Sequence, residues 1–351
     1  MLKINIIIYS ARKRSEPTLM SRLKKYHREE LLMNISGGGI KIFGCNGNHV
    51  LAEKIASELG LSLSKCEVSK FSDGEISVRI NETVRGSDVF IVQPTSYPVN
   101  DNLMELLITI DAVKRASAGR INAVVPYYGY ARQDRKAKAR DPISAKLVAD
   151  LITSAGADRV ITMDLHCAQI QGFFNIPVDH LVGMPLLSKY YGEKFGYGNE
   201  NVVAVSPDLG SVTRTRAFAE QLDVPIAIVD KRRPKPNVSE IMNIIGEFKD
   251  KTVILYDDMI DTAGTITNAA NAIVERGAKE VYACCTHGVL SGAAIERIQN
   301  SQIKELLVLD TVPLTPEKAI PKIKQKSVSK VFADAIYRIH EGLPVSRIFE
   351  Y

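Results

Sequence analysis

The sequence predicts an α/β protein with two tandem, doubly wound parallel-sheet domains. From Ile40 onward, short apolar segments alternate with longer segments of helical periodicity, the order expected of parallel sheets with helical crossovers. The chain has 351 residues, enough for two ordinary domains that each bury a core. Clusters of polar residues directly follow the apolar segments. Because ligands bind at the carboxyl ends of strands in open α/β sheets, those clusters are the candidate functional residues.

The expected strands are short, apolar and suited to burial within a sheet. They are Ile40–Phe43, Val89–Val92, Ile121–Val125, Val160–Met163, Val202–Val205, Ile226–Val229, Val253–Tyr256, Val281–Cys285 and Leu306–Leu309. The segments between them have helical periodicity and include Val50–Leu59, Leu103–Ala116, Ser144–Ser154, Val212–Leu222, Thr265–Arg276 and Gly292–Ile298. Such connections are right-handed and return each strand parallel to the previous one.

The chain divides near residues 177–183 into halves that look like weak structural repeats. We expect a first domain at 33–181, to which the tail 341–351 returns, and a second domain at 182–340. Residues 1–32 differ from the rest because they are rich in Lys, Arg, Ser and Glu, and Met33 could begin a protein by itself. We predict that 1–32 is a non-native or disordered extension. The alternative is a genuine basic tail or a short amphipathic helix.

Composition narrows the class of protein and its partners. Hydrophobic content of 45% and charged content of 24% are typical of a soluble globular protein. A net charge of +5 is modest for this length, so it favours small anionic substrates over a nucleic-acid partner. The five cysteines form no C-x-x-C pair, which predicts a reducing, cytoplasmic compartment. No apolar run approaches the roughly 20 residues of a membrane span, so we expect no membrane partner.

The most informative segment runs from Val253 to Thr265. An apolar strand is followed by two acids, Asp257 and Asp258, and then by a small, hydroxyl-rich turn before a helix. The turn Asp261-Thr262-Ala263-Gly264-Thr265 supplies backbone N–H groups and hydroxyls at a helix N-terminus, an arrangement that binds phosphate. Because carboxylates repel phosphate, Asp257 and Asp258 are expected to face sugar hydroxyls or a metal instead. Helix capping by Asp is the alternative.

Three further strands are followed by polar residues that suit phosphates or a metal. Arg132 and Gln133 lie in a basic, tyrosine-rich loop that either contacts phosphate and a base or is simply solvated. His166 either ligates a metal or is merely hydrogen-bonded. Asp208 either holds Mg²⁺ or caps the next helix.

Two more loops complete the set. The proline-rich loop from Asp230 to Asn237 carries four cations, including Lys231 and Arg233, and could close over a charged transition state or form a surface charge run. The segment Phe71-Ser72-Asp73-Gly74-Glu75 combines an aromatic ring with acceptors that could read adenine, or it is an ordinary turn. The chain contains no G-x-x-x-x-G-K-[ST] loop, so any nucleotide is held by other means.

Together these motifs resemble a known family. The 253–265 segment resembles the fingerprint of the type I phosphoribosyltransferase fold, and the chain from about Ile35 to Phe349 resembles the ribose-phosphate pyrophosphokinases. The other specific matches are 71–75, 130–136, 164–166, 206–208 and 231–234. The resemblance implies two domains of phosphoribosyltransferase type. It also implies transfer of the pyrophosphoryl group of ATP to the C1 hydroxyl of ribose 5-phosphate, giving 5-phosphoribosyl 1-diphosphate and AMP.

The resemblance assigns a role to each motif. Phe71, Asp73 and Glu75, from a neighbouring subunit, would hold adenine, and Arg132 and Gln133 would contact ATP. His166 and Asp208 would serve Mg²⁺. Asp257 and Asp258 would bind the ribose hydroxyls, and Asp261, Thr262, Ala263, Gly264 and Thr265 the 5-phosphate. Lys231 and Arg233 would be catalytic, stabilising charge around the β-phosphorus.

The resemblance further implies regulation and self-association. Inorganic phosphate would activate the enzyme, ADP would inhibit it, and dimers would build a homohexamer. Regulatory positions would be Thr83, Arg85, Ser117, Arg140, Ser327 and Ser329. Two departures stand out: Ser211 replaces a usual glycine, which would tighten a turn, and Ala293 replaces a common proline.

Three alternatives share parts of this pattern. A phosphoribosyltransferase would consume the diphosphate and lack the 71–75 and 132–136 segments. A catalytically silent regulatory subunit should have a damaged cationic or ribose-phosphate loop, whereas both are intact here. An RNA-binding regulator on the same fold is disfavoured by the modest net charge.

Overall fold

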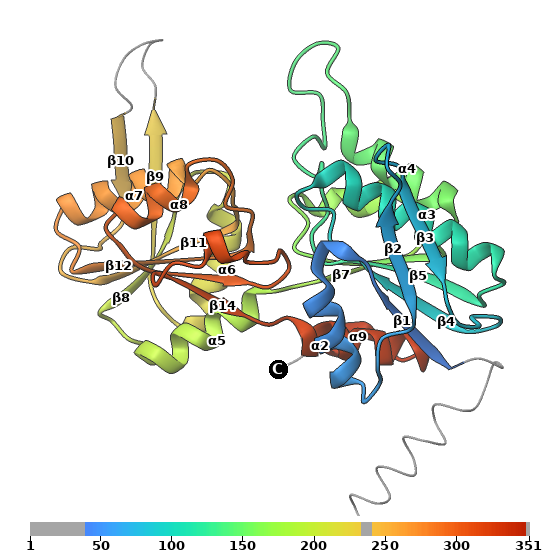
Figure 1. Ribbon diagram of the computed structural model, residues 1–351. Coiled ribbons are helices and arrows are strands. Elements are labelled where there is room, and N and C mark those ends of the chain that lie inside the picture. The colour runs from blue at the N-terminus through green and yellow to red at the C-terminus, as the bar shows by residue number, and fades with distance from the viewer. Residues whose placement is uncertain (1–38, 233–240, 349–351) are drawn as a thin grey trace, which may run out of the picture.

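The computed structural model describes residues 39–232 and 241–348, and it consists of two α/β lobes (Figure 1). The lobes contain a five-stranded sheet and a seven-stranded sheet. All nine predicted strands and all six predicted helices are present, most with ends within a few residues of the prediction. The predicted extension 1–32 lies outside the described residues. The α/β prediction with parallel sheets is therefore confirmed.

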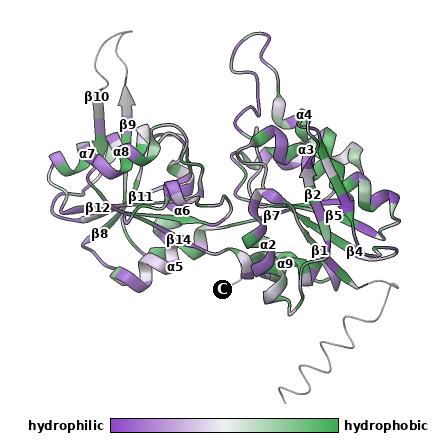
Figure 2. Ribbon diagram, in the orientation of Figure 1, coloured by the Kyte–Doolittle hydropathy of each residue, from purple (hydrophilic) through white to green (hydrophobic). Residues whose placement is uncertain are grey.

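The first sheet has the order β1-β4-β5-β6-β7, and every neighbouring pair is parallel. Its strands are β1 (Ile40–Gly44), β4 (Asp88–Val92), β5 (Arg120–Val125), β6 (Arg159–Met163) and β7 (Val178–Leu181). Helices α3 (Val99–Arg115) and α4 (Ser144–Ala155) cover one face, and α2 (His49–Glu58) and α9 (Ser329–His340) cover the other. Burial on both faces explains why β4, β5 and β6 are largely apolar, whereas the edge strand β7 is mostly half-buried and carries Asp179 and His180 (Figure 2).

A short hairpin stands apart from this sheet. Strands β2 (Cys66–Lys70) and β3 (Ile76–Ile80) pair antiparallel and carry the 71–75 turn at their tip. The hairpin is fastened to α3 by an ion pair from Lys70 to Asp101 at 2.5 Å. The backbone N–H of Phe71 also donates to the carbonyl of Glu75 at 2.8 Å, so the turn closes as a hairpin loop.

The second sheet has the order β10-β9-β8-β11-β12-β13-β14. Its strands are β8 (Val202–Ser206), β9 (Ile226–Arg232), β10 (Ile241–Ile245), β11 (Thr252–Ile260), β12 (Glu280–Gly288), β13 (Ile303–Leu309) and β14 (Ile323–Lys326). Only the β9–β10 pair is antiparallel among the pairs in the described part of this sheet. Successive strands are added on one side of the sheet from β8 to β10 and on the other side from β11 to β14. The carboxyl ends of β8 and β11 therefore form the switch point at which open α/β sheets bind ligands.

Helices cover both faces of this sheet as well. Helices α5 (Met184–Phe195) and α6 (Val212–Leu222) pack on one face, and α7 (Gly264–Glu275) and α8 (Ala294–Asn300) pack on the other. None of the helices in the described part of the chain combines the length and the hydrophobicity needed to cross a bilayer.

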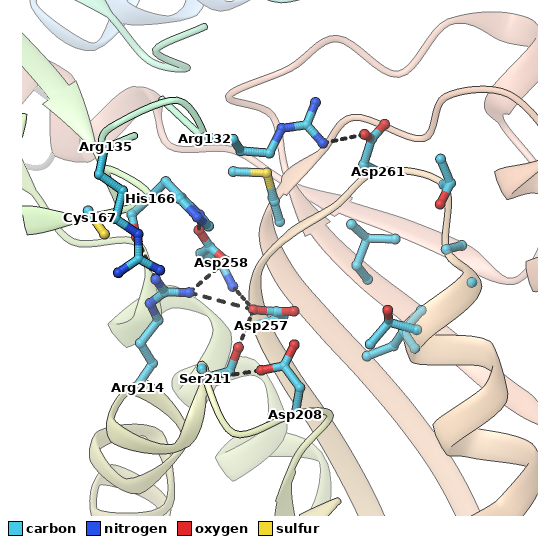
Figure 3. Close-up of a pocket in the computed structure, with 18 residues that line it drawn as sticks. Arg132, Arg135, His166, Cys167, Asp208, Ser211, Arg214, Asp257, Asp258 and Asp261 are labelled. Atoms are coloured by element: carbon cyan, nitrogen blue, oxygen red, sulfur yellow. Dashed lines mark hydrogen bonds and ion pairs between the residues drawn. The ribbon is translucent and has the colours of Figure 1, made fainter. Parts of the chain in front are cut away.

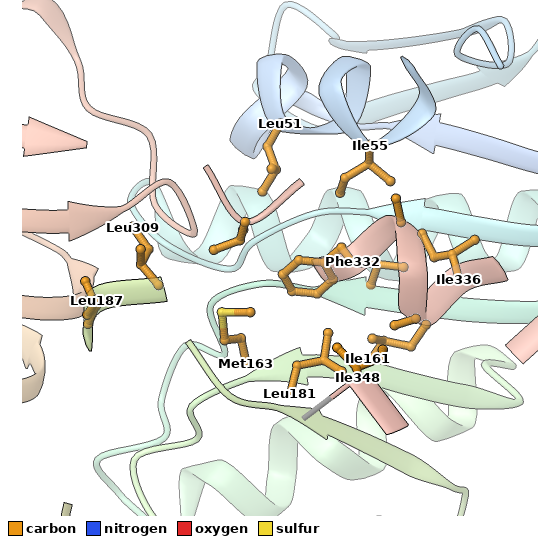
Figure 4. Packing of buried hydrophobic residues seen from close by; sticks show 14 of the residues in the cluster. Leu51, Ile55, Ile161, Met163, Leu181, Leu187, Leu309, Phe332, Ile336 and Ile348 are labelled. Carbon is orange, nitrogen blue, oxygen red and sulfur yellow. The ribbon is translucent and has the colours of Figure 1, made fainter. Parts of the chain in front are cut away.

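One hydrophobic core continues from the first lobe into the second. Leu187 of α5 and Leu309 of β13 belong to the same buried cluster as Met163, Leu181 and Phe332 of the first lobe (Figure 4). Helix α9 packs against α2, so Ser329–His340 belongs to the first lobe, and its predicted place in the second domain is wrong. Of the predicted returning tail, residues 341–348 are described, and Ile348 is part of the same core. The segment that joins the lobes is pinned by a hydrogen bond from the Gly183 N–H to Asp164 Oδ2 at 3.0 Å. The lobes are thus held by packing as well as by their covalent connection.

We predict that Phe332→Ala lowers the free energy of unfolding by about 3–5 kcal/mol, because Phe332 is fully buried at the centre of this core. Urea unfolding measures the loss, and exposed Lys330→Ala on the same helix is the control. Equal stability of the two variants would contradict a structural role for α9 in the first lobe.

Candidate active site

The candidate site is a cavity of about 400 Å³ at the carboxyl ends of β8 and β11 (Figure 3). It is lined by Arg132, Arg135, His166, Cys167, Asp208, Gly210, Ser211, Arg214 and residues 257–266. Arg132 to Cys167 belong to the first lobe and the rest to the second, so both lobes form its wall. Three arginines and four aspartates in this lining give it strong and mixed charge, which suits a ligand that carries both phosphates and hydroxyls.

Asp257 and Asp258 lie within β11, because this strand continues to Ile260, four residues beyond the predicted end. Asp258 is 5% exposed and has two charged partners: His166 Nδ1 lies 2.9 Å from Oδ2, and Arg214 Nη1 lies 2.6 Å from Oδ1. Arg214 also donates from Nη2 to the carbonyl of His166 at 2.6 Å. The pair of acids is therefore not a helix cap. It is the centre of a charged network that joins the two lobes.

The two neighbouring carboxyls have opposite pKa shifts. Burial, followed by the negative charge of Asp258, raises the pKa of Asp257 to about 7. Burial would also raise the pKa of Asp258, but its hydrogen bond with His166 and the charge of Arg214 outweigh burial and lower it to about 2. Asp258 is thus the permanently ionised member of the pair. Asp257 is the member whose negative charge is disfavoured by burial and by its neighbour.

Asp208 and Ser211 form the turn between β8 and α6. The Ser211 N–H donates to Asp208 Oδ1 at 3.0 Å, so Asp208 holds the turn before α6, but the N-cap of α6 is Ser211 and the predicted capping by Asp208 is not found. The remaining carboxylate oxygen of Asp208 faces the cavity (Figure 3). Ser211 has a φ of −93°, which any residue adopts, so replacement of glycine does not strain the turn. Instead, its hydroxyl donates to Asp257 Oδ1 at 2.7 Å.

The predicted phosphate loop lies at the N-terminus of α7. Ala263 is in the left-handed region with a φ of 60°, and Gly264 begins the helix. The first N–H groups of a helix have no partner within it and attract anions. The loop is held from outside, because Arg297 Nη1 donates to the carbonyl of Thr262 at 2.7 Å. Thr262, Ala263, Gly264 and Thr265 all line the cavity, and their binding of phosphate stays a prediction.

Asp261, at the start of this loop, is already engaged. Its Oδ2 pairs with Arg132 Nη1 at 2.5 Å, and its Oδ1 accepts a hydrogen bond from the Ser291 hydroxyl. Burial would raise the pKa of Asp261, but Ser291 and then Arg132 outweigh burial and lower it. Asp261 therefore fastens the loop to the first lobe through Arg132.

One ring nitrogen of His166 is engaged and the other is not used by that contact. Its Nδ1 is engaged by Asp258, which leaves Nε2 as the remaining ring nitrogen, the arrangement common to histidine ligands. Among the described residues, no group of three or more His, Cys, Asp or Glu side chains could hold a metal by itself. His166 and Asp208 line one cavity, so they fit an ion that arrives with phosphate oxygens and water.

The structure does not bring every predicted residue to the cavity. Phe71, Asp73 and Glu75 are at the tip of the β2–β3 hairpin, where Phe71 is 59% exposed, and none of them lines the cavity. Gln133 lies beside Arg132 but is not part of the lining. Lys231 is in β9, paired with Met242, and Arg233 lies outside the described residues.

The six regulatory candidates are far apart along the chain. Thr83 and Arg85 precede β4, and Ser117 precedes β5. The two segments are adjacent, because Arg85 bridges to Ala118 and the Gly86 N–H donates to the Ser117 carbonyl at 2.8 Å. Ser327 and Ser329 lie at the start of α9, joined by a hydrogen bond of 3.2 Å. Arg140 is exposed in the loop between β5 and α4. Their regulatory role stays a prediction.

Sequence reasoning missed Arg214, Ser291 and the contact made by Ser211, and it included Arg135 only as one cation of the 130–136 loop. A signal for Arg214 existed. It is the third residue of α6, and a cation in the first turn of a helix opposes the helix dipole. Such a cation implies an acidic partner, which here is Asp258. Ser291 had no comparable signal, since its contact with Asp261 spans 30 residues.

Comparison with known proteins agrees with this geometry. The family model for the N-terminal domain of ribose phosphate pyrophosphokinase matches residues 40–156, and that for the phosphoribosyl synthetase-associated domain matches 231–350. A ribose-phosphate pyrophosphokinase from Clostridium tetani is 68% identical over 89% of this chain and 97% of its own. The chain belongs to the ribose-phosphate pyrophosphokinase family.

Other relatives extend the comparison. A ribose-phosphate pyrophosphokinase from Bacillus cereus is 61% identical over 88% of this chain and 97% of its own. Among solved structures, the phosphoribosylpyrophosphate synthetase from Mycobacterium smegmatis superposes with a TM-score of 0.82 at 44% identity, covering 86% of this chain and 99% of that one. The phosphoribosyltransferase-type fold predicted from the 253–265 segment is thus confirmed over both lobes.

The pKa of Asp257 generates a prediction about stability. Its folded pKa of about 7 exceeds the ordinary value of 3.8, so its favourable contribution is present below pH 4 and is lost as pH rises through 7. Asp257→Asn removes this pH-dependent loss of stability, and its amide oxygen can still accept a hydrogen bond from the Ser211 hydroxyl. We expect the ligand-free variant to melt at least about 2–4 °C above wild type at pH 8, with a smaller difference at pH 5.

Differential scanning calorimetry of both proteins at the two pH values measures this. The pKa of Asp258 is about 2 and does not change charge in that window. A difference in Tm that is the same at pH 5 and pH 8 would contradict a raised pKa for Asp257.

Proposed function

We propose that this protein transfers the pyrophosphoryl group of ATP to the C1 hydroxyl of ribose 5-phosphate, giving 5-phosphoribosyl 1-diphosphate and AMP for nucleotide biosynthesis. The observation that carries the proposal is that one cavity is lined both by Asp257 and Asp258 and by the 262–265 loop at the α7 N-terminus. The C1 oxygen bonds to the β-phosphorus of ATP, the bond from that phosphorus to the oxygen of AMP breaks, and the hydroxyl proton is released. The atoms balance without any further reactant.

Ribose 5-phosphate binds across the carboxyl end of β11. The 5-phosphate occupies the N–H groups and hydroxyls of Thr262 to Thr265, where the helix dipole favours an anion. The sugar hydroxyls donate to the carboxylates of Asp257 and Asp258. A sugar held at both ends in this way has its C1 hydroxyl in a fixed direction, and such fixing is a large part of the catalysis of phosphoryl-type transfer.

ATP binds on the side of the cavity formed by the first lobe. Arg132 and Arg135 line that side and suit its phosphates. Phe71, Asp73 and Glu75 would hold adenine from a neighbouring subunit, which fits their exposure at a hairpin tip outside this cavity. Lys231 is in the last part of β9, at the end of the second sheet where the cavity lies, and Lys231 and Arg233 would stabilise charge around the β-phosphorus.

Mg²⁺ would be held by Asp208 and His166 together with the ATP phosphates. Bound there, it neutralises phosphate charge and so lowers the repulsion that the attacking oxygen meets. Asp208 presents one free carboxylate oxygen, and His166 is oriented by Asp258.

Self-association and regulation belong to the same proposal. We infer a cytoplasmic homohexamer built from dimers, activated by inorganic phosphate and inhibited by ADP. The support is that the predicted adenine-binding turn does not line the cavity of its own chain, so a second copy would complete the site. A phosphoribosyltransferase would not need that turn, and a silent regulatory subunit would not need an intact 262–265 loop.

We predict that the wild-type protein forms AMP and 5-phosphoribosyl 1-diphosphate from ATP and ribose 5-phosphate in the presence of Mg²⁺ and inorganic phosphate. Lys231→Ala should lower kcat by at least about 100-fold, since it removes a cation from the transition state. Product formation is followed chromatographically. Lys249→Ala, an exposed lysine near β10, is the matched control and should keep wild-type activity.

Absence of AMP from wild type at every phosphate concentration would instead favour the regulatory subunit. Formation of a nucleotide from 5-phosphoribosyl 1-diphosphate and a free base would favour the phosphoribosyltransferase.

A further inference from the structure

All the donor contacts of Asp257 fall on one of its two oxygens. Oδ1 accepts from the Ser211 hydroxyl at 2.7 Å and from the Asp258 N–H at 2.9 Å, and Arg214 Nη1 lies 3.6 Å away. The other oxygen, Oδ2, points into the cavity, toward the side where the phosphate loop lies (Figure 3). One oxygen of the carboxylate is therefore held by protein donors, and the other faces the cavity.

Ser211 is itself rigidly held. Its N–H donates to Asp208 Oδ1 at 3.0 Å, and its carbonyl accepts from both the N–H and the hydroxyl of Thr215 at 2.9 Å. The residue is only 3% exposed. These contacts fix the position of its hydroxyl beside Asp257 at the start of α6.

A terminal carboxylate rotates over a broad, nearly two-fold torsional profile unless its oxygens are engaged. The Asp258 N–H is adjacent in sequence, and Arg214 makes its short contact with Asp258, at 2.6 Å. The Ser211 hydroxyl is consequently the closest side-chain donor to Asp257 in the described part of the chain.

We propose that Ser211 is a positioning residue for ribose binding, whose hydroxyl fixes the Asp257 carboxylate so that Oδ2 meets a ribose hydroxyl. The inference rests on the proposed function, because it assumes that Asp257 binds the sugar. Ser211 acts only through Asp257. Its loss therefore affects the sugar more than the nucleotide.

The test compares Ser211→Ala with wild type in the full-length enzyme. A hydrogen bond to a charged group is lost, so the Kd for ribose 5-phosphate, measured by calorimetric titration, should rise about tenfold. The KM for ribose 5-phosphate should rise in parallel, while the KM for ATP and kcat stay within about twofold of wild type. Should Ser211→Ala fail to fold, Ser211→Gly gives the same comparison, because its backbone conformation suits any residue.

Two controls separate positioning from a general structural loss. Ser188→Ala removes another buried hydroxyl, bonded to Gln221 at 2.5 Å in the second lobe away from the cavity lining, and should leave the Kd unchanged. In an Asp257→Asn background, Ser211→Ala should add less than about twofold to the Kd, because its effect passes through that carboxylate.

The outcomes are distinct. If wild type and Ser211→Ala bind ribose 5-phosphate with equal affinity, this inference is wrong and the proposed function is unaffected. An undiminished effect of Ser211→Ala in the Asp257→Asn background would likewise contradict this inference alone. Wild type that binds no ribose 5-phosphate would overturn the proposed function and this inference with it.

Discussion

The burial of two adjacent carboxylates at the end of β11 is the constraint on which the site depends. Two such charges repel each other and lose hydration, so they need compensation from elsewhere in the fold. Asp258 receives it from His166 and Arg214, and Asp257 receives only partial compensation through Ser211 and a backbone N–H. The raised pKa of Asp257 is the residual cost. A hydrogen bond from a sugar hydroxyl to Asp257 would stabilise its ionised form and so offset part of that cost.

The residues that compensate the charges of these two acids also connect the lobes. His166 follows β6 of the first sheet, yet it pairs with Asp258 of the second, and Arg214 of the second lobe binds the His166 carbonyl. Arg132 reaches from the first lobe to Asp261 beside the phosphate loop. The continuous hydrophobic core through Leu187, Leu309 and Phe332 sets the two sheets at the distance that these contacts require. Any shift between the lobes would therefore disturb both the paired acids and the 262–265 loop.

The sequence was a good guide where a local pattern has a single physical meaning. Central parallel strands are largely apolar, so all nine strands that the sequence predicts are present, and the hydroxyl-rich turn before α7 lies at a helix N-terminus as expected. The sequence did not predict β2, β3, β7, β10 or β14, and β7 and β14 carry several polar residues. It was a poor guide where tertiary contacts decide. Strand β11 runs four residues past its apolar segment because β12 pairs with it as far as Gly288. The contacts of Ser291 and Ser211 with distant acids, and the return of α9 to the first lobe, leave no mark in local sequence.

The central claim is that ribose hydroxyls meet Asp257 and Asp258 while the 5-phosphate occupies the α7 N-terminus. A crystal structure of the protein with ribose 5-phosphate tests it most directly. The account predicts phosphate oxygens within hydrogen-bond distance of the backbone N–H groups between Thr262 and Thr265, and a ribose hydroxyl on Asp257 Oδ2. A phosphate bound instead between Arg135 and Arg214, with the sugar away from both acids, would contradict it.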